Sequence, residues 1–271
     1  MIGEDAEETD MKAIVCFDVD MTLLDHATYR VPDSAMEALD RMRGRHYLVL
    51  ATGRDMDTYY SRQIRDLLQA DAIIHSNGTR ITVGDQVIYE SRMPRELVRS
   101  LLDFAEAEGL SLGATIGDED YYTHPEQVTR LDIHRWGESG RQYQDPWKLL
   151  ERGVRTLAYI GGPEGAARIE QVFPELKCPL FAGKQGADVL EKKNSKANGL
   201  KRLCRYYGVD QAHTYAFGDS MNDYEILKEA GVGIAMGNAL EELKAAADYV
   251  TDDISRDGVY KACLHFGLLE D

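Results

Sequence analysis

Residues 13–22 read AIVCFDVDMT, a stretch in which an apolar run passes directly into an acidic turn. Its apolar half is rich in strand formers, long enough for a buried strand and too short for a helix. Two carboxylates, Asp18 and Asp20, follow at once. Because ligands of α/β sheets bind beyond the carboxyl ends of the strands, both side chains can point into such a crevice. The alternative at this point is a solvated acidic turn.

Similar short apolar runs recur along the chain, and amphipathic helical patterns lie between several of them. The runs are YLVLAT (47–52), AIIHS (72–76), TYAFG (214–218), VGIAM (232–236) and YVT (249–251). The helical patterns span 32–43, 56–68, 195–207 and 221–230. Strands that alternate with helices predict the α/β class, with a doubly wound, mostly parallel sheet covered on both faces.

The middle of the chain has a different pattern. It combines expected strands at 87–89, 112–116, 156–160 and 188–190, helices at 95–108 and 164–173, and a polar, aromatic-rich stretch at 118–147 without clear periodicity. A second α/β unit inserted into the first is the simplest account. The expected division is an acidic, disordered tail at 1–10, a core at 11–80 and 188–271, and an inserted cap at 81–187.

Three more constellations follow expected strands or open expected helices. Thr52 and Gly53 offer a hydroxyl and an exposed amide, which suit an anion but also fit a plain turn. Lys196 opens a helix, where a cation without an anionic partner is mildly unfavourable, although most helix lysines are solvated. Asp219 and Asp223 lie on one face of the expected helix, and their carboxylates suit Mg²⁺. The alternative for Asp219 alone is that it caps this helix. Together these groups are the inventory of phosphoryl transfer.

The order of the motifs identifies a family. They read FDVDMTLLD (17–25), ATGR (51–54), NSKANGL (194–200) and GDSMNDYEIL (218–227), with SNGT (76–79), AMGNA (235–239) and DGV (257–259) beside them. From about residue 12 to 263 the chain resembles the Cof-type branch of the haloacid dehalogenase superfamily, whose phosphatases use an aspartate nucleophile. The resemblance implies a Rossmann-like core with an α/β cap inserted between the second and third motifs.

The same resemblance implies a role for each motif residue. Asp18 would attack phosphorus and form an aspartyl-phosphate, while Asp20 would protonate the leaving alkoxide and then activate water. The implied ligands of Mg²⁺ are Asp18, Asp20 through its backbone carbonyl, Asp219 and, in or next to that shell, Asp223. The implied ligands of the phosphoryl oxygens are Val19, Thr52, Gly53, Lys196 and Asn222.

The cap of such enzymes supplies specificity, so its aromatic and histidine side chains are candidates for substrate contact. The candidates are Tyr121, Tyr122, His124 and Trp136, with His134, Tyr143 and Trp147 beside them. Each also fits a place in the cap core or on its surface. Met21 stands where Cof-type members usually carry glycine, and its larger side chain would narrow the range of accessible leaving groups.

Composition limits the partners. Among 271 residues, 31 are Lys or Arg and 47 are Asp or Glu, so the net charge is −16. This balance argues against nonspecific nucleic-acid binding and against anionic membranes, since phosphate contacts need cations. No apolar run approaches the roughly 18 to 20 residues of a membrane helix. The scattered cysteines Cys16, Cys178, Cys204 and Cys263 indicate free thiols, and we expect a cytoplasmic protein without a secretory leader.

The sequence therefore predicts a Mg²⁺-dependent phosphatase of small phosphomonoesters, such as a sugar phosphate, pyridoxal phosphate or flavin mononucleotide. Two alternatives stay open. One is a sugar phosphomutase or phosphotransferase of the same superfamily, and the other is a catalytically silent member that only binds a ligand. No pattern in the chain indicates an oligomeric state.

Overall fold

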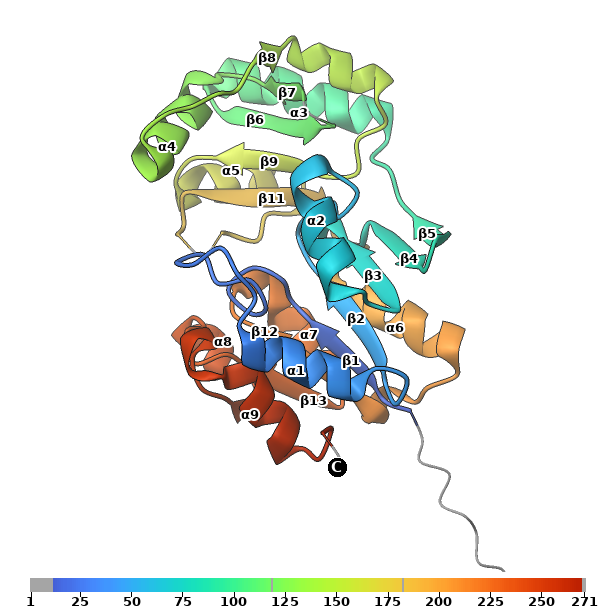
Figure 1. The fold of residues 1–271 in the computed structure, drawn as a ribbon. Helices are drawn as coiled ribbons and strands as arrows, with labels where there is room; N and C mark the ends of the chain where they lie inside the picture. Colours follow the sequence, from blue (N-terminus) through green and yellow to red (C-terminus); the bar gives the residue numbers. More distant parts are fainter. Residues whose placement is uncertain (1–11, 118, 182, 270–271) are drawn as a thin grey trace, which may run out of the picture.

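The structure is a computed structural model that describes residues 12–117, 119–181 and 183–269 (Figure 1). The expected acidic tail at 1–10 lies outside the described residues. Two sheets of eight and six strands organise the described part of the chain, and each has its own buried apolar cluster. None of the helices in this part is long and apolar enough to cross a membrane.

The first sheet has the order β14-β13-β12-β1-β2-β3-β4-β5. Its strands are β1 (Ile14–Phe17), β2 (Tyr47–Ala51), β3 (Ala72–His75), β4 (Arg80–Val83), β5 (Gln86–Glu90), β12 (Thr214–Gly218), β13 (Val232–Ala235) and β14 (Tyr249–Val250). The strands from β14 to β3 are parallel, and β4 and β5 complete the edge in antiparallel order. All six strands expected around this core are present, which confirms the α/β fold class.

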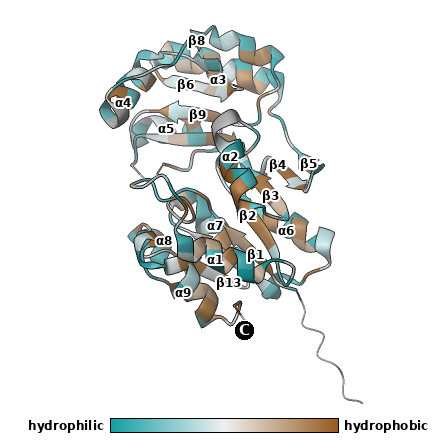
Figure 2. Ribbon diagram, in the orientation of Figure 1, coloured by the Kyte–Doolittle hydropathy of each residue, from teal (hydrophilic) through white to brown (hydrophobic). Residues whose placement is uncertain are grey.

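Helices cover this sheet because their apolar stripes match a period of 3.6 residues. They are α1 (Asp33–Met42), α2 (Tyr59–Leu68), α6 (Lys196–Tyr207), α7 (Tyr224–Glu229), α8 (Glu241–Lys244) and α9 (Gly258–His265). Helices α1 and α9 pack together in front of the sheet in Figure 1, while α6 packs against α7 and β3. Figure 2 shows strands β2 and β3 as largely hydrophobic and the helices as mixed, which is the pattern of a sheet buried on both faces.

The second sheet lies above the first in Figure 1 and has the order β10-β11-β9-β6-β7-β8. Its strands are β6 (Ser111–Ile116), β7 (Glu119–Tyr122), β8 (Tyr143–Gln144), β9 (Leu157–Ile160), β10 (Leu176–Lys177) and β11 (Gly186–Glu191). Its helices are α3 (Arg95–Glu108), α4 (Glu126–Trp136) and α5 (Pro163–Val172). Apart from the parallel pair β7–β8, its strands run antiparallel.

The chain changes sheets later than the expected boundaries at 81 and 187. Strands β4 and β5 form a hairpin on the edge of the first sheet, so the first change comes after Glu90. Strand β11 pairs with β9 of the second sheet, so the return comes after Glu191. Within 118–147, where no periodicity was visible, the structure has β7, α4 and β8. Two of these are short, and α4 carries only a weak apolar stripe, so tertiary contacts decide them.

Candidate active site

The motifs meet at one edge of the first sheet because its central strands are parallel. Phe17, the last residue of β1, is in register with Leu50 of β2 and with Phe217 of β12. Asp18 and Thr52 therefore leave the sheet at the same edge as Asp219. From β1 the chain continues to β2 and β3 on one side, while β12, β13 and β14 extend the sheet on the other side. The strand order therefore reverses between β1 and β12, and their carboxyl ends form the topological switch point of the sheet.

A buried lysine joins two of the aspartates. Lys196 Nζ donates to Asp18 Oδ1 at 2.7 Å and to Asp223 Oδ1 at 2.6 Å. The Lys196 residue is 1% exposed, and Asp18 and Asp223 are also buried. The carboxylates of Asp18, Asp219 and Asp223 each place an oxygen within 4.8 Å of the others. Three acids thus face a single buried ammonium group. Lys196 is the first residue of α6, where a cation is mildly unfavourable, and these acids are the anionic partners expected for it.

Burial and mutual repulsion govern the charges of this cluster. Burial, with the nearby Asp223 and Asp20 charges, raises the pKa of Asp18 to about 7 although Lys196 opposes the shift. Burial, together with the Asp18 and Asp223 charges, raises the pKa of Asp219 to about 9. For Lys196, burial would lower the pKa, but the two bonded carboxylates outweigh it and raise its pKa. The protein alone therefore leaves negative charge at this edge of the sheet incompletely balanced.

The same cluster suits a divalent cation. The candidate ligand atoms of Asp18, Asp219 and Asp223 are all carboxylate oxygens, with no sulfur ligand in the group. Such hard oxygen ligands match Mg²⁺. In the part of the chain that the structure describes, no side chain donates a hydrogen bond to the Asp219 carboxylate. An ion with two positive charges would balance the excess of acid over the Lys196 ammonium. The residues present therefore fit a bound cation of this type.

The turn after β12 is built by its own hydrogen bonds. Asp223 Oδ2 accepts from the backbone amides of Asp219 and Ser220 at 3.1 and 3.2 Å, forming a capping box over the short helix η4 (Met221–Asp223). Glycine is needed at position 218, because a Cβ there would lie 2.4 Å from Asp223 Cγ. The single helix expected at 221–230 is thus η4 followed by α7. Asp223 turns its other oxygen to Lys196, so one carboxylate shapes the loop and anchors the lysine.

Asp20 has different partners from the acidic cluster. Its carboxylate accepts from Arg54 Nε at 2.7 Å and from Arg54 Nη2 at 2.6 Å, and it lies 2.6 Å from His26 Nε2. Burial would raise the pKa of Asp20, but the His26 and Arg54 hydrogen bonds outweigh it and hold that pKa below its usual range. The Asp20 side chain is therefore ionised in this arrangement. Because Arg54 and His26 occupy both of its carboxylate oxygens, any contact of Asp20 with a metal would come from its backbone carbonyl.

The expected phosphate ligands lie around the same edge. The buried Thr52 hydroxyl accepts from the Arg54 amide at 3.0 Å. Gly53 faces Asn222, whose Nδ2 would lie 3.6 Å from a Cβ built on the glycine. Asn222 Nδ2 donates to Asn77 Oδ1 at 3.2 Å. Val19 places its side chain in the main core, and its carbonyl accepts from two amides of the following turn.

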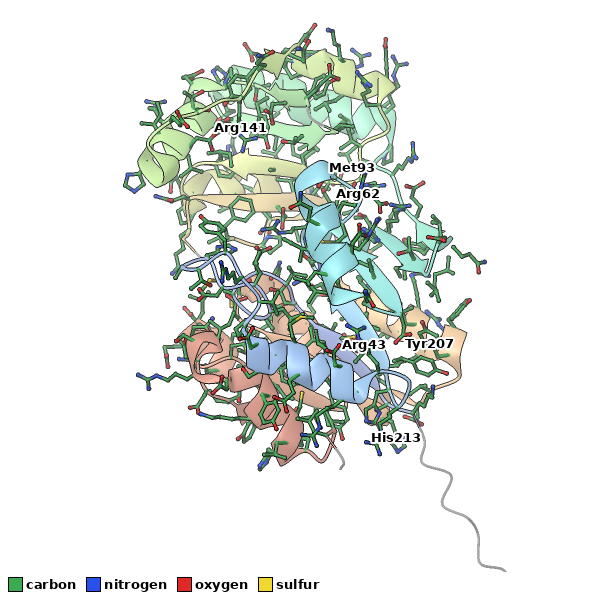
Figure 3. The ribbon with its side chains drawn as sticks, viewed as in Figure 1. Arg43, Arg62, Met93, Arg141, Tyr207 and His213 are labelled. Carbon is green, nitrogen blue, oxygen red and sulfur yellow. The ribbon has the colours of Figure 1, made fainter. Side chains whose placement is uncertain are left out.

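A cleft of about 1170 Å³ lies between the two sheets and reaches the site at Gly53 and Arg54. Tyr122 of β7 and Arg141 of the loop between α4 and β8 contribute to its lining, and Figure 3 labels Arg141 on the side of the second sheet. Arg141 Nη1 donates to Asp120 Oδ1 at 2.7 Å. The cleft is larger than the roughly 300 to 1,000 Å³ of ordinary ligand pockets, so it has room for a substrate beyond the phosphate itself.

Among the expected cap contacts, Tyr122 lines the cleft, whereas Tyr121 and His124 do not. Tyr121 is buried in the second core and donates to Glu119, because adjacent residues of β7 point to opposite faces. His124 lies beside Glu106 and Glu126. Of the further candidates, Tyr143 forms a hydrogen bond with the Thr129 hydroxyl, and Trp147 Nε1 donates to Asp103 Oδ1. His134 lines a separate pocket. The Trp136 side chain lies outside the described residues.

Met21 also lies away from the cleft lining. It is partly buried and packs against the main core. Its φ is +60°, in the left-handed region that glycine adopts most easily. Glycine would adopt this backbone conformation more easily than methionine. The expected effect of Met21 on leaving groups stays a prediction.

Three polar residues at the site have no role assigned from the sequence, although Arg54 belongs to the ATGR motif. His26 and Arg54 hold Asp20, and Asp188 of β11 reaches the core to accept from Asn77. The available signal for Asp188 is a lone acid between the apolar residues Ala187 and Val189. Strand alternation sends that acid to the face opposite the buried pair.

Comparison with known proteins decides the family. A family model described as haloacid dehalogenase-like hydrolase matches residues 15–263. The chain belongs to the haloacid dehalogenase-like hydrolases. This assignment confirms the resemblance seen in the four motifs.

Individual relatives of this family extend over nearly the whole chain. YkrA of Bacillus subtilis, which carries phosphatase in its name, is 30% identical over 95% of this chain and 98% of its own. The HMP-PP phosphatase of Cronobacter sakazakii is 28% identical over 94% of this chain and 96% of its own. The subclass IIB sugar phosphatase BT4131 is 30% identical with a TM-score of 0.83, covering 95% of this chain and all of that one. The chain is a phosphatase of this family.

Proposed function

We propose that this phosphatase hydrolyses small phosphomonoesters through a phosphorylated Asp18, with a divalent cation, Mg²⁺, in the acidic cluster. The observation that carries the proposal is the buried contact of Lys196 with Asp18 and Asp223, beside Asp219, at the carboxyl ends of parallel strands. This arrangement supplies a nucleophile, a fixed positive charge and metal-binding oxygens within one crevice. The relatives' names support phosphatase chemistry in this fold.

In the first step, an Asp18 oxygen attacks phosphorus while the ester oxygen leaves and takes a proton from Asp20. Lys196 holds Asp18 Oδ1, so the carboxylate keeps one orientation and its other oxygen is left to attack the phosphorus. Thr52, the Gly53 amide and Asn222 are placed to bind the phosphoryl oxygens. A bound Mg²⁺ would neutralise charge on the phosphoryl group and on the acidic cluster.

In the second step, water attacks the phosphorus of the aspartyl-phosphate and gives its proton to Asp20. Phosphate leaves, and both aspartates return to their starting forms. The contacts of Asp20 with Arg54 and His26 stabilise its carboxylate, which is the form that accepts this proton. Donation in the first step requires the Asp20 side chain to leave Arg54, since the ion pair holds it deprotonated.

Direct product analysis tests the proposal. The purified protein with Mg²⁺ should release inorganic phosphate from 4-nitrophenyl phosphate and from members of a panel of sugar, pyridoxal and flavin phosphates. Isomerised sugar phosphate without net phosphate release would instead identify a mutase, and inactivity on every ester would identify a silent binding protein. The size of the cleft supports small organic phosphates as the substrate class. Four buried free cysteines support a reducing, cytoplasmic location as part of this proposal.

Removal of divalent cations should abolish phosphate release, and Mg²⁺ should restore it. Mg²⁺ should also raise the melting temperature, because an ion at 100 times its dissociation constant stabilises the folded state by about 2.7 kcal/mol. Asp219→Asn should reduce this thermal shift. The matched control is Asp57→Asn, which alters a second acidic group whose carboxylates already pair with arginines. An equal Mg²⁺ shift in wild type and Asp219→Asn would contradict the proposed site.

Without divalent cations, the stability of the fold should fall as the pH rises from about 4 to about 9. The pKa of Asp18 is raised from 3.8 to about 7 and that of Asp219 to about 9, so the folded protein holds more protons than the unfolded chain across this window. The free energy of unfolding then decreases with pH. Urea denaturation in a chelator at several pH values measures the slope, and Asp219→Asn should flatten it. A slope of opposite sign in this window would contradict the charge arrangement.

A further inference from the structure

Asp188 reaches from the second sheet into the active site. Its neighbours Ala187 and Val189 are buried in the second core, so strand alternation turns Asp188 toward the cleft that it lines. Its Oδ2 accepts from Asn77 Nδ2 at 2.7 Å. A Cβ built on Gly53 would lie 3.3 Å from the same oxygen. The carboxylate therefore stands directly beside the glycine that is placed to bind phosphate.

Asp188 also ends a hydrogen-bonded chain that begins in the loop after β12. Ser220 Oγ donates to Asn222 Oδ1 at 2.7 Å, Asn222 donates to Asn77, and Asn77 donates to Asp188. Asn77 adopts a left-handed backbone conformation with φ of +53°, which aims its amide between the two sheets. The position of the Asp188 carboxylate is thus set from the catalytic side as well as from its own strand.

The carboxylate has acceptor capacity to spare. A carboxylate can accept about four hydrogen bonds, and among the described residues only Asn77 donates one to Asp188. Burial raises the pKa of Asp188 to about 6 although the Asn77 hydrogen bond opposes this shift, so one donor does not offset the burial of the carboxylate. A negative group this close to a phosphate would repel it unless the substrate itself brings a donor.

Other ion pairs also join the two sheets besides this partly buried acid. Arg155, just before β9, pairs with Asp55 and donates to Glu90 Oε1 of β5 at 3.0 Å. Lys177 of β10 pairs with Glu225 of α7 on another side. These contacts link the layers through residues other than Gly53 and Asn77, so the place of Asp188 beside the site points to a role toward what enters the cleft.

We propose that Asp188 is a specificity-determining residue, which accepts a hydrogen bond from a hydroxyl or amine on the leaving group close to the ester oxygen. The inference rests on the proposed phosphatase function and narrows its substrates to polyol, sugar or amino-alcohol phosphates. Esters whose leaving group lacks such a donor place an unpaired carboxylate against their carbon chain, and this costs them binding in the transition state.

Glycerol 1-phosphate and propyl phosphate test this, because they differ only in the hydroxyls. Wild type should prefer glycerol 1-phosphate, and Asp188→Ala should lower kcat/KM for that ester by roughly 10- to 100-fold. For propyl and 4-nitrophenyl phosphate the same substitution removes the unpaired carboxylate, so their kcat/KM should stay level or rise. Asp188→Asn, which keeps the shape and an acceptor oxygen, should retain part of the preference. Melting curves should show that both variants fold.

The matched control is Lys177→Ala, which removes a contact between the two sheets outside the cleft and should keep the wild-type ratio of the two esters. A common loss for all three esters in Asp188→Ala would show that the residue only docks the second sheet, and would overturn the proposal. An equal kcat/KM of wild type for glycerol and propyl phosphate would overturn it too. Failure of wild type to release phosphate from any ester in the presence of Mg²⁺ would instead overturn the phosphatase function on which it rests.

Discussion

Asp18→Asn is expected to reduce phosphate release by at least about 10⁴-fold while the protein stays folded. An amide of the same shape cannot form the aspartyl-phosphate, so the first step has no nucleophile. The substitution also removes one of three crowded carboxylates, and Asp223 remains as a partner for Lys196. In a chelator, the melting temperature should therefore equal or exceed that of wild type.

Steady-state phosphate release and thermal melting measure the two halves of this prediction. Asp40→Asn is the matched control, since Asp40 is an exposed acid on α1 that pairs with Arg43 far from the cluster. It should keep both activity and melting temperature. Activity close to wild type in Asp18→Asn would remove Asp18 from the mechanism, and a collapse of the fold would show that the carboxylate is structural.

Lys196→Met is expected to destabilise the metal-free protein by about 3–5 kcal/mol, because it leaves buried carboxylates without their cation. Lys196 lies fully inside the protein between Asp18 and Asp223, so water cannot solvate these carboxylates when the ammonium group is removed. Methionine fills a similar volume, which separates loss of charge from loss of packing. Phosphate release should fall by roughly 10²- to 10³-fold as well, as for other groups that stabilise charge in a transition state.

Urea denaturation in a chelator and again in Mg²⁺ tests the origin of this loss. Mg²⁺ should recover part of the stability, because it supplies positive charge to the same carboxylates. Lys201→Met on the same helix is the control: Lys201 pairs with Glu229 near the surface and should contribute less than about 1 kcal/mol. Equal stability of Lys196→Met and wild type would mean that the carboxylates are protonated rather than balanced by the lysine.

Much of the core could be predicted because local patterns and tertiary packing agree there. The run at 13–17 is uniformly apolar and becomes β1, whose four residues are all buried. Helix α3 begins at Arg95 and ends at Glu108 as its spacing predicted. The region of β7 and α4 was missed because its short strand and weakly amphipathic helix owe their form to neighbouring elements. The expected boundary at 81 puts β5 in the cap, whereas its antiparallel pairing with β4 keeps it on the first sheet, and no local pattern specifies that pairing.

The sequence by itself determined which groups follow the parallel strands. Two acids after β1, a threonine after β2 and acids after β12 must gather at one edge, since the carboxyl ends of parallel strands share that edge. Lys196 opens α6, and the N-terminus of α6 lies at the same edge because this helix leads back to the start of the parallel strand β12. Only the tertiary structure decided which oxygen Lys196 holds, that Arg54 and His26 take the Asp20 carboxylate, and that Asp188 crosses to Asn77. Those contacts join residues far apart in the chain, and no local pattern specifies the distance or the burial that sets their charge.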